Sequence, residues 1–102
     1  MLDGAHVYIL RCADRSYYVG VTRDDPELRL AQHNAGSYPG YTSTRRPVEM
    51  VFVDWCERIT DAIENERRIK RWSRAKKEAL IRGDFAALRV LASRKARSKS
   101  DT

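Results

Sequence analysis

The chain has 102 residues, of which 42% are hydrophobic and 33% charged. Its formal net charge of +6 favours a polyanionic partner, although any soluble basic protein has such a charge. Its two cysteines and two histidines have none of the spacings of a zinc site. The two cysteines therefore indicate reduced thiols of a cytoplasmic protein. We find neither a signal-type start nor a membrane-length apolar run, and we expect one domain over residues 1–92 before a basic, disordered tail over 93–102.

Two short apolar segments, residues 5–12 and 17–22, predict the strands of a β-hairpin. Val, Ile and Tyr dominate both segments, and the polar residues between them suit a turn. Each strand carries a tyrosine, Tyr8 or Tyr18, and Gly20 indicates a bulge or the close approach of another group. The hairpin can therefore hold two phenols together, although core packing explains two tyrosines equally well, and the pattern leaves the strand register open.

A helix is predicted from residue 26 to about residue 35, with Asp25 as its N-cap and Gly36 as its end. Arg29 and His33 lie four residues apart, so they share one face of this helix. An equally ordinary interpretation of such a pair is two side chains that point into solvent. Because the helix directly follows the second strand, its first half should lie near the tyrosine of that strand.

Residues 36–46 predict a loop that is rich in Gly, Ser and Thr. It also contains aromatic rings, which can stack on bases, and arginines, which can meet phosphates, as in proteins that bind single-stranded nucleic acids. An ordinary surface loop is an equal alternative. The side chains concerned are Tyr38, Tyr41, Arg45 and Arg46.

Residues 48–55 predict a third strand, with Val51, Val53 and Trp55 on one face.

Residues 61–72 predict a second helix with Thr60 as its N-cap. Glu66 falls within the apolar stripe of this helix, four residues after Ala62 and three before Ile69. A carboxylate on the core side is costly unless it is paired, hydrogen-bonded or bound to a metal. Two interpretations stay open here, a buried salt bridge to the arginine of the first helix and a metal ligand.

Ser73 predicts the start of a short helix over 74–82, which ends at Gly83, and Asp84 predicts the cap of a last helix. The residues of that last helix expected to face inward are Phe85, Leu88 and Leu91.

Basic residues are dense between positions 58 and 82, with nine Lys or Arg against four Asp or Glu. Much of this charge is the solvated face of two helices, but its density makes it the strongest candidate for contact with a phosphate backbone. The residues expected to make that contact are Lys70, Arg74, Lys76 and Lys77.

Taken in order, these segments resemble the GIY-YIG nuclease superfamily, and in particular its small stand-alone bacterial members. The resemblance covers about residues 5–82, and it rests on VYIL at 7–10, YVG at 18–20, R-x-x-x-H-N at 29–34 and A-x-x-x-E at 62–66. Further matches are YPGYT at 38–42, Arg46-Pro47 and W-S-x-A-K-K at 72–77. The resemblance implies an α+β fold, a three-stranded antiparallel sheet flanked by helices, and metal-dependent cleavage of DNA.

The resemblance also assigns roles to single residues. The implied catalytic residues are Tyr8, Tyr18, Arg29, His33 and Glu66, with Gly20 as the motif glycine. Glu66 would hold one divalent ion, Mg²⁺ or Mn²⁺, and Arg29 would bind phosphoryl oxygens as a fork. One tyrosine would take a proton from water with help from its neighbours, since an unperturbed phenol has a pKa of about 10. Which tyrosine does so is open, and we expect all five groups to converge on one site.

We therefore expect a metal-dependent endonuclease that acts on single-stranded or structured DNA, with RNA as an open alternative and no membrane partner. The main rival hypothesis is a nucleic-acid-binding module of the same fold with little or no catalytic activity. A protein-interaction domain with incidental charge is the third. The sequence makes no prediction of the oligomeric state.

Overall fold

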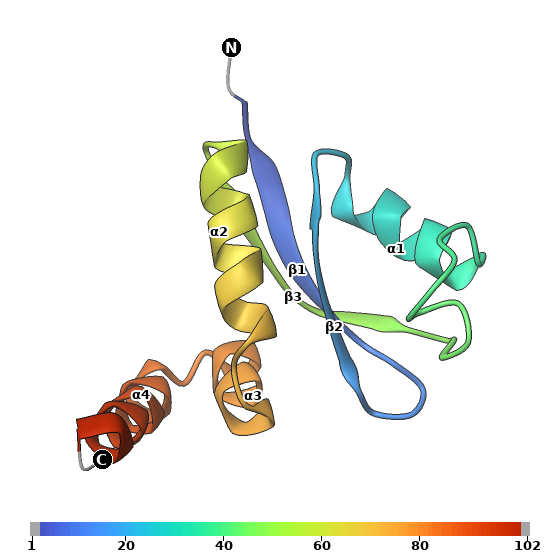
Figure 1. Ribbon diagram of the computed structural model, residues 1–102. Coiled ribbons are helices and arrows are strands. Elements are labelled where there is room, and N and C mark those ends of the chain that lie inside the picture. Colours follow the sequence, from blue (N-terminus) through green and yellow to red (C-terminus); the bar gives the residue numbers. More distant parts are fainter. Residues whose placement is uncertain (1–2, 101–102) are drawn as a thin grey trace. The chain divides into compact units, whose positions relative to one another are not determined.

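The computed structural model describes the backbone of residues 3–100 and the side chains of residues 3–92. Its elements in chain order are β1 (Ala5–Arg11), β2 (Tyr17–Thr22), α1 (Pro26–Asn34), β3 (Glu49–Cys56), α2 (Ile59–Lys70), α3 (Arg74–Arg82) and α4 (Phe85–Ser100) (Figure 1). The chain divides into two compact units, residues 1–70 and 71–102. The predicted α+β fold, with a three-stranded antiparallel sheet and helices, is confirmed.

The sheet has the order β2-β1-β3, so β1 is central and both neighbours are edge strands. The β1–β2 register pairs Tyr8 with Gly20 and Leu10 with Tyr18. Cross-strand partners share a face of the sheet, and residues two apart in a strand do so too. The register, which the sequence had left open, therefore places Tyr8, Gly20 and Tyr18 on one face.

The expected alternation in β3 is wrong at Val51, because a β-bulge interrupts the strand there. Ile9 pairs with Phe52 and Leu10 pairs with Met50, so Val51 is the extra residue of β3 at this point. A bulge of this kind lets two residues oppose one and shifts the strand's faces by one position. Met50 thereby reaches the face that carries Leu10 and packs against the apolar cluster there.

The first helix begins and ends as predicted. Asp25 caps α1, since its side chain accepts a hydrogen bond from the backbone N–H of Glu27 at 2.9 Å. A proline occupies the first turn, and Ala35 is the C-cap. Gly36 follows with a φ of +78°, a conformation that costs glycine little.

The second helix begins at Ile59, two residues earlier than predicted, so Thr60 lies inside its first turn and is not its N-cap. The early start of the helix depends on contacts with a segment distant in the sequence. Asp3 forms an isolated β-bridge with Arg58, and the Asp3 carbonyl accepts a hydrogen bond from the N–H of Ile59 at 2.6 Å. A backbone group distant in sequence thus satisfies a first-turn N–H that has no partner within the helix.

Both faces of β1 are buried. Tyr8 and Leu10 pack with Cys12 and Val48 in one cluster, against which Leu30 of α1 also packs. Val7 and Ile9 point to the other face and are at most 1% exposed. Helix α2 contacts β1 and β2, and Figure 1 shows it on the opposite side of the sheet from α1. The tyrosines therefore share their face with α1.

In the second unit, α3 and α4 pack against each other. The predicted caps are confirmed: Ser73 accepts from the N–H of Lys76, Gly83 ends α3 with a φ of +71°, and Asp84 accepts from the N–H of Ala87 at 3.0 Å. The inward orientation of Phe85 is wrong, since this residue opens α4 beside its cap and is 59% exposed.

The predicted tail, residues 93–102, begins within α4, whose backbone continues to Ser100. The side chains of this segment and the last two residues lie outside the described part of the chain, so its disorder stays a prediction. None of the helices over residues 3–100 combines the length and the apolar character that crossing a bilayer requires.

Candidate functional site

The centre of the candidate site is a buried contact between a phenol and an imidazole. The hydroxyl of Tyr8 on β1 lies 3.0 Å from Nε2 of His33 on α1. Tyr8 is 1% exposed and His33 is 2% exposed. Burying two polar groups costs free energy, and the hydrogen bond between them offsets that cost.

The other imidazole nitrogen also has a partner. Nδ1 of His33 lies 2.8 Å from Oγ1 of Thr42, a buried residue of the loop between α1 and β3. The His33 ring contacts the ring of Tyr38 with centroids 4.9 Å apart, and that of Tyr18 with centroids 5.3 Å apart. Ring contacts and two hydrogen bonds therefore hold the imidazole from the strands and from the loop at once.

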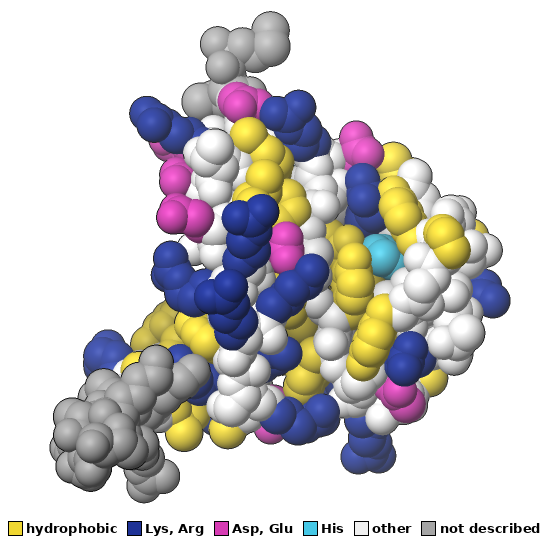
Figure 2. Space-filling model, in the orientation of Figure 1, with side chains coloured by type: hydrophobic (Ala, Val, Ile, Leu, Met, Phe, Trp, Pro, Cys, Tyr) yellow, Lys and Arg dark blue, Asp and Glu magenta, His cyan; other side chains and the backbone are white. Residues whose placement is uncertain are grey.

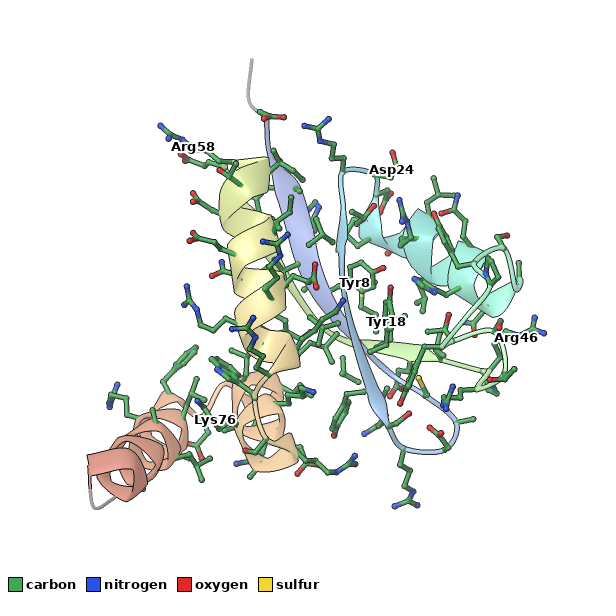
Figure 3. All side chains as sticks on the ribbon, in the orientation of Figure 1. Tyr8, Tyr18, Asp24, Arg46, Arg58 and Lys76 are labelled. Atoms are coloured by element: carbon green, nitrogen blue, oxygen red, sulfur yellow. The ribbon has the colours of Figure 1, made fainter. Side chains whose placement is uncertain are left out.

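Tyr18 lies beside Tyr8 on the same face of the sheet, between β2 and α1 (Figure 3). Their ring centroids are 6.4 Å apart. Tyr18 differs from Tyr8 in being only half-buried. Of the two phenols that the hairpin brings together, Tyr18 is thus the more accessible to solvent.

Gly20 makes room for this arrangement. A Cβ atom at this position would lie 2.5 Å from the Tyr8 hydroxyl oxygen and 3.0 Å from a ring carbon of Tyr18. The first distance is far inside van der Waals contact, so no side chain fits without displacing Tyr8. The sequence-based expectation that another group approaches Gly20 closely is met by the Tyr8 hydroxyl itself.

Arg29 contributes the positive charge of the site. Its guanidinium lies 4.8 Å from the centroid of the Tyr38 ring and pairs with Asp24 at 3.3 Å. Its side chain is 19% exposed. Within the described part of the chain, its Nε atom is buried without a hydrogen-bond partner. Arg29 therefore retains an unused donor beside the two tyrosines.

Burial shapes the protonation of the phenol–imidazole pair. It raises the pKa of Tyr8 well above its ordinary value, the neighbouring Tyr18 adds to this shift, and the charge of Arg29 partly offsets it. Burial also lowers the pKa of His33, and the Arg29 cation acts in the same direction. Tyr8 is therefore a protonated phenol and His33 a neutral imidazole at neutral pH.

The loop residues expected to bind nucleic acid take different positions. Tyr38 lies half-buried in the site, where its hydroxyl donates to Oε1 of Gln32 at 3.2 Å. Tyr41 is 41% exposed and stacks on Tyr18, with ring centroids 6.2 Å apart. Tyr41 thus lies at the surface, whereas Tyr38 is part of the wall around His33.

The two loop arginines hold the loop in place. Arg45 lies 3.9 Å from the centroid of the Tyr41 ring and donates to Asp14 at 3.0 Å. Arg46, at the outer edge of the loop in Figure 3, donates to the backbone carbonyls of Ser43 and Asn34. Both guanidinium groups have these internal partners, so phosphate binding would use only their remaining donors.

Glu66 comes from α2, the helix on the other side of the sheet. Its carboxylate is 17% exposed and pairs with Nζ of Lys70 at 2.8 Å. Of the two interpretations that the sequence left open, the structure therefore contains an ion pair, but with Lys70 instead of Arg29. No hydrogen bond or ion pair among residues 3–92 joins Glu66 to the ring cluster, and its role as a metal ligand stays a prediction.

The donor set around Glu66 limits which metal it could hold. No group of three or more His, Cys, Asp or Glu gathers at one point among residues 3–92. An all-protein metal cage is thus not present there. A single carboxylate still fits Mg²⁺, which keeps several waters and binds proteins through one or two carboxylates together with substrate phosphates.

The predicted phosphate-contacting residues fall into both units. Lys70 belongs to α2, where Lys and Arg side chains crowd the exposed surface (Figure 2). Arg74, Lys76 and Lys77 belong to α3 in the second unit. There Lys76 lies 4.7 Å from the centroid of the Trp72 ring, and partial burial lowers the pKa of Lys77. Their contact with nucleic acid stays a prediction.

Thr42 is a member of the site that sequence reasoning did not single out. It lies within the YPGYT segment, but a threonine in a Gly/Ser/Thr-rich loop gives no signal of its own. Only the fold of the loop over α1 shows that this one hydroxyl is buried against an imidazole.

Comparisons with known proteins give the family of this chain. Residues 4–79 match the family model described as the GIY-YIG catalytic domain. A UPF0213 protein of Halobacterium salinarum is 44% identical over 76 residues, which cover 74% of this chain and 97% of the relative. A UPF0213 protein of Staphylococcus aureus is 38% identical over 81 residues, covering 79% and 98%.

Two solved structures are also similar. The UPF0213 protein BH0048 from Bacillus halodurans is 36% identical with a TM-score of 0.50, covering 76% of this chain and 82% of that one. Protein EF2693 from E. faecalis is 31% identical with a TM-score of 0.55, covering 84% and 93%. From the matched domain and these relatives, we conclude that the chain belongs to the GIY-YIG catalytic-domain family.

Proposed function

We propose that this protein is a metal-dependent endonuclease that hydrolyses phosphodiester bonds of single-stranded or structured DNA. The observation that carries the proposal is the convergence of Tyr8, Tyr18, Arg29 and His33 from three different elements. Buried polar side chains gathered in this way, with shifted pKa values, are typical of functional sites.

Tyr18 is the better candidate for the group that accepts a proton from the attacking water. It is half-buried and faces the surface, whereas Tyr8 is buried, and burial raises the pKa of Tyr8. A general base must reach its proton within about 3 Å, directly or through one water. Tyr8 in this proposal orients Tyr18 and His33 instead of reacting.

Arg29 would stabilise the charge that develops on the phosphoryl oxygens. It has a buried donor without a partner within the described part of the chain, and its planar group can bind two oxygens at once. Its ring contact with Tyr38 and its ion pair with Asp24 hold the guanidinium in a set orientation before substrate arrives.

Glu66 would hold the divalent ion, Mg²⁺ or Mn²⁺, and Lys70 would have to release the carboxylate for this. When bound, such an ion would supply Lewis-acid stabilisation of the phosphate and of the leaving oxygen. Because β2 is an edge strand with α1 on one side and α2 on the other, a nucleic acid lying along that edge is accessible from both helices. A substrate in this location would contact both Glu66 and the ring cluster.

The exposure of Tyr41 at the surface supports single-stranded or unpaired substrate. Bases that are not stacked in a duplex can stack on an aromatic ring, and each such contact is worth about 1–3 kcal/mol. Tyr41 already stacks on Tyr18, and the Arg45 guanidinium lies 3.9 Å from the centroid of the same ring. A base that displaces this guanidinium would continue the stack towards the candidate site. The free thiols of Cys12 and Cys56 support a reducing compartment such as the cytoplasm.

One observation favours a second candidate function, a nucleic-acid-binding module with little or no catalytic activity. Glu66 is paired with Lys70, and no hydrogen bond or ion pair joins it to the other candidate catalytic residues within residues 3–92. If that ion pair persists in solution, the basic surface and the aromatic loop would bind nucleic acid without cleaving it.

A cleavage assay separates the two functions. The full chain is incubated with single-stranded, duplex and branched DNA, and with single-stranded RNA, in the presence of Mg²⁺, Mn²⁺ or a chelator. The nuclease proposal expects cleavage of single-stranded or branched DNA that the chelator abolishes. Binding of the same substrates without cleavage under any metal condition would instead establish the binding module.

A further inference from the structure

The guanidinium of Arg45 is held between two segments, the loop over residues 36–46 and the turn that joins β1 to β2. Within the loop, its Nη1 donates to the Tyr41 carbonyl at 2.8 Å, and its central carbon lies 3.9 Å from the centroid of the Tyr41 ring. From the turn, the carboxylate of Asp14 accepts from Nε at 3.0 Å. The Arg45 side chain is 33% exposed and that of Asp14 is 50% exposed, so a solute can reach this ion pair.

Asp14 occupies an edge of the guanidinium that a phosphate would use. Arginine binds a phosphate in a fork through two parallel N–H donors, and one such edge consists of Nε and Nη2. Because Asp14 holds Nε, that fork is incomplete while the ion pair is closed, and a phosphate has only the remaining donors. A phosphate oxygen and a carboxylate oxygen are both anionic acceptors, so the two compete for the same donor.

The ion pair can open without undocking the loop. Exposed ion pairs contribute little to stability. The N–H of Ala13 donates to the Arg45 carbonyl at 2.9 Å, and this backbone contact between turn and loop involves neither charge. Asp14 keeps its place as well, because its Oδ1 accepts from the N–H of Ser16 at 3.0 Å. Hydrogen bonds from the hydroxyl and the N–H of Ser16 lower the pKa of Asp14, so it is a carboxylate at neutral pH.

We infer that Asp14 is an intramolecular competitor for Arg45, whose carboxylate occupies the guanidinium in the free protein and is replaced by a backbone phosphate when a single strand binds over Tyr41. The exchange also releases the guanidinium from the turn, so it can move aside for a base on the Tyr41 ring. Asp14 thereby lowers the affinity for nucleic acid without being part of the ring cluster. The inference rests on the nucleic-acid binding in the proposed function and requires no cleavage.

The test measures binding in the absence of cleavage. A short fluorescein-labelled oligothymidylate is titrated with the full chain in the presence of a chelator, and fluorescence anisotropy gives Kd. Asp14→Asn removes the charge and keeps the oxygen that accepts from Ser16, while its amide N–H₂ cannot accept from the guanidinium. Glu49→Gln is the matched control, because it makes the same change in charge and releases Arg11, the exposed partner of Glu49 on the same sheet.

We expect Asp14→Asn to lower Kd about threefold, because an exposed ion pair no longer has to open before the phosphate binds. Glu49→Gln should change Kd much less. In an Arg45→Gln background, Asp14→Asn should have only the small effect of the changed charge, since no guanidinium is left to release. In ¹H–¹⁵N spectra of the wild type, the Nε–H resonance of Arg45, identified by its loss in Arg45→Gln, should shift when the oligonucleotide is added.

The inference is overturned if Asp14→Asn and Glu49→Gln bind alike, or if the gain from Asp14→Asn is undiminished in the Arg45→Gln background. An Nε–H resonance of Arg45 that does not move on binding would overturn it even if Asp14→Asn did not fold. Tighter binding by Asp14→Asn, with no cleavage by any protein in the nuclease assay, would overturn the proposed catalytic function and leave this inference in place. Absence of binding by the wild type and by Asp14→Asn would overturn the inference, and the cleavage assay then decides the proposed function independently.

Discussion

Tyr8 and His33 are separated by 25 positions in the chain, yet the phenolic oxygen and Nε2 of the imidazole lie 3.0 Å apart in the protein interior. The pair joins the central strand to the first helix. Tyr18, Tyr38 and Thr42 surround the imidazole of this pair. The consequences for activity and stability follow from how tightly the two groups are held.

Replacement of Arg29 by lysine should impair cleavage severely although the charge is kept. Lysine cannot offer two parallel donors to a phosphate, and it loses the planar contact with Tyr38. We expect kcat to fall about 100-fold, as for the loss of one preorganised donor. Arg23→Lys is the matched control, because Arg23 is 61% exposed and pairs with Asp3 outside the site. Equal activity of the two variants would remove the fork geometry from the mechanism.

Glu66→Ala should abolish metal-dependent cleavage and leave DNA affinity nearly unchanged. The substitution also removes the ion pair with Lys70, but an i,i+4 pair on a helix is worth only about 0.5 kcal/mol, so the variant should fold. Cleavage and fluorescence-anisotropy binding are measured in parallel. Glu64→Ala, an exposed glutamate of the same helix, is the control. Activity retained in Glu66→Ala would exclude this carboxylate as the metal ligand.

Gly20→Ala should destabilise the protein because the new methyl group overlaps the Tyr8 hydroxyl at 2.5 Å. Overpacking of a tightly packed interior costs about 1–3 kcal/mol in the free energy of unfolding. Urea denaturation measures this loss. A Tyr8→Phe background removes the hydroxyl oxygen but leaves the ring carbon Cζ at 2.6 Å from the added methyl group, so Gly20→Ala should destabilise the protein there too. An unchanged free energy of unfolding in Gly20→Ala would show that the Tyr8 ring does not limit the space at this position.

Stability should fall as the pH is lowered through the range in which histidine titrates. The pKa of His33 is lower in the folded protein than in the unfolded chain, so protonation favours unfolding. This contribution is fully present above the unfolded pKa of about 6.5 and is lost as the pH drops below it.

Urea denaturation at about pH 7.5 and about pH 5.5 brackets that range and stays above the titration of carboxylates such as Asp14, whose pKa is itself lowered. The wild type should lose stability between the two pH values, and His33→Asn should lose much less. An equal loss in both proteins would assign the pH dependence to another group.

Much of the architecture was predictable because the signals are local. Asp25 and Ser73 cap their helices as predicted, since a capping side chain contacts N–H groups two or three residues away. Gly83 ends α3 because the required left-handed conformation is nearly free for glycine. The resemblance to the GIY-YIG family named the motif residues Tyr8, Tyr18, Arg29 and His33 before any contact between them was known.

Contacts between distant segments decided the rest. The β1–β2 register placed both tyrosines on the face of Gly20, and the bulge at Val51 and the early start of α2 at Ile59 depend on partners far away in the chain. The roles of Thr42 and of Lys70 beside Glu66 likewise depend on which groups meet after folding. Periodicity and capping are properties of neighbouring residues, whereas the partner of a buried polar atom is set only when separate segments pack together.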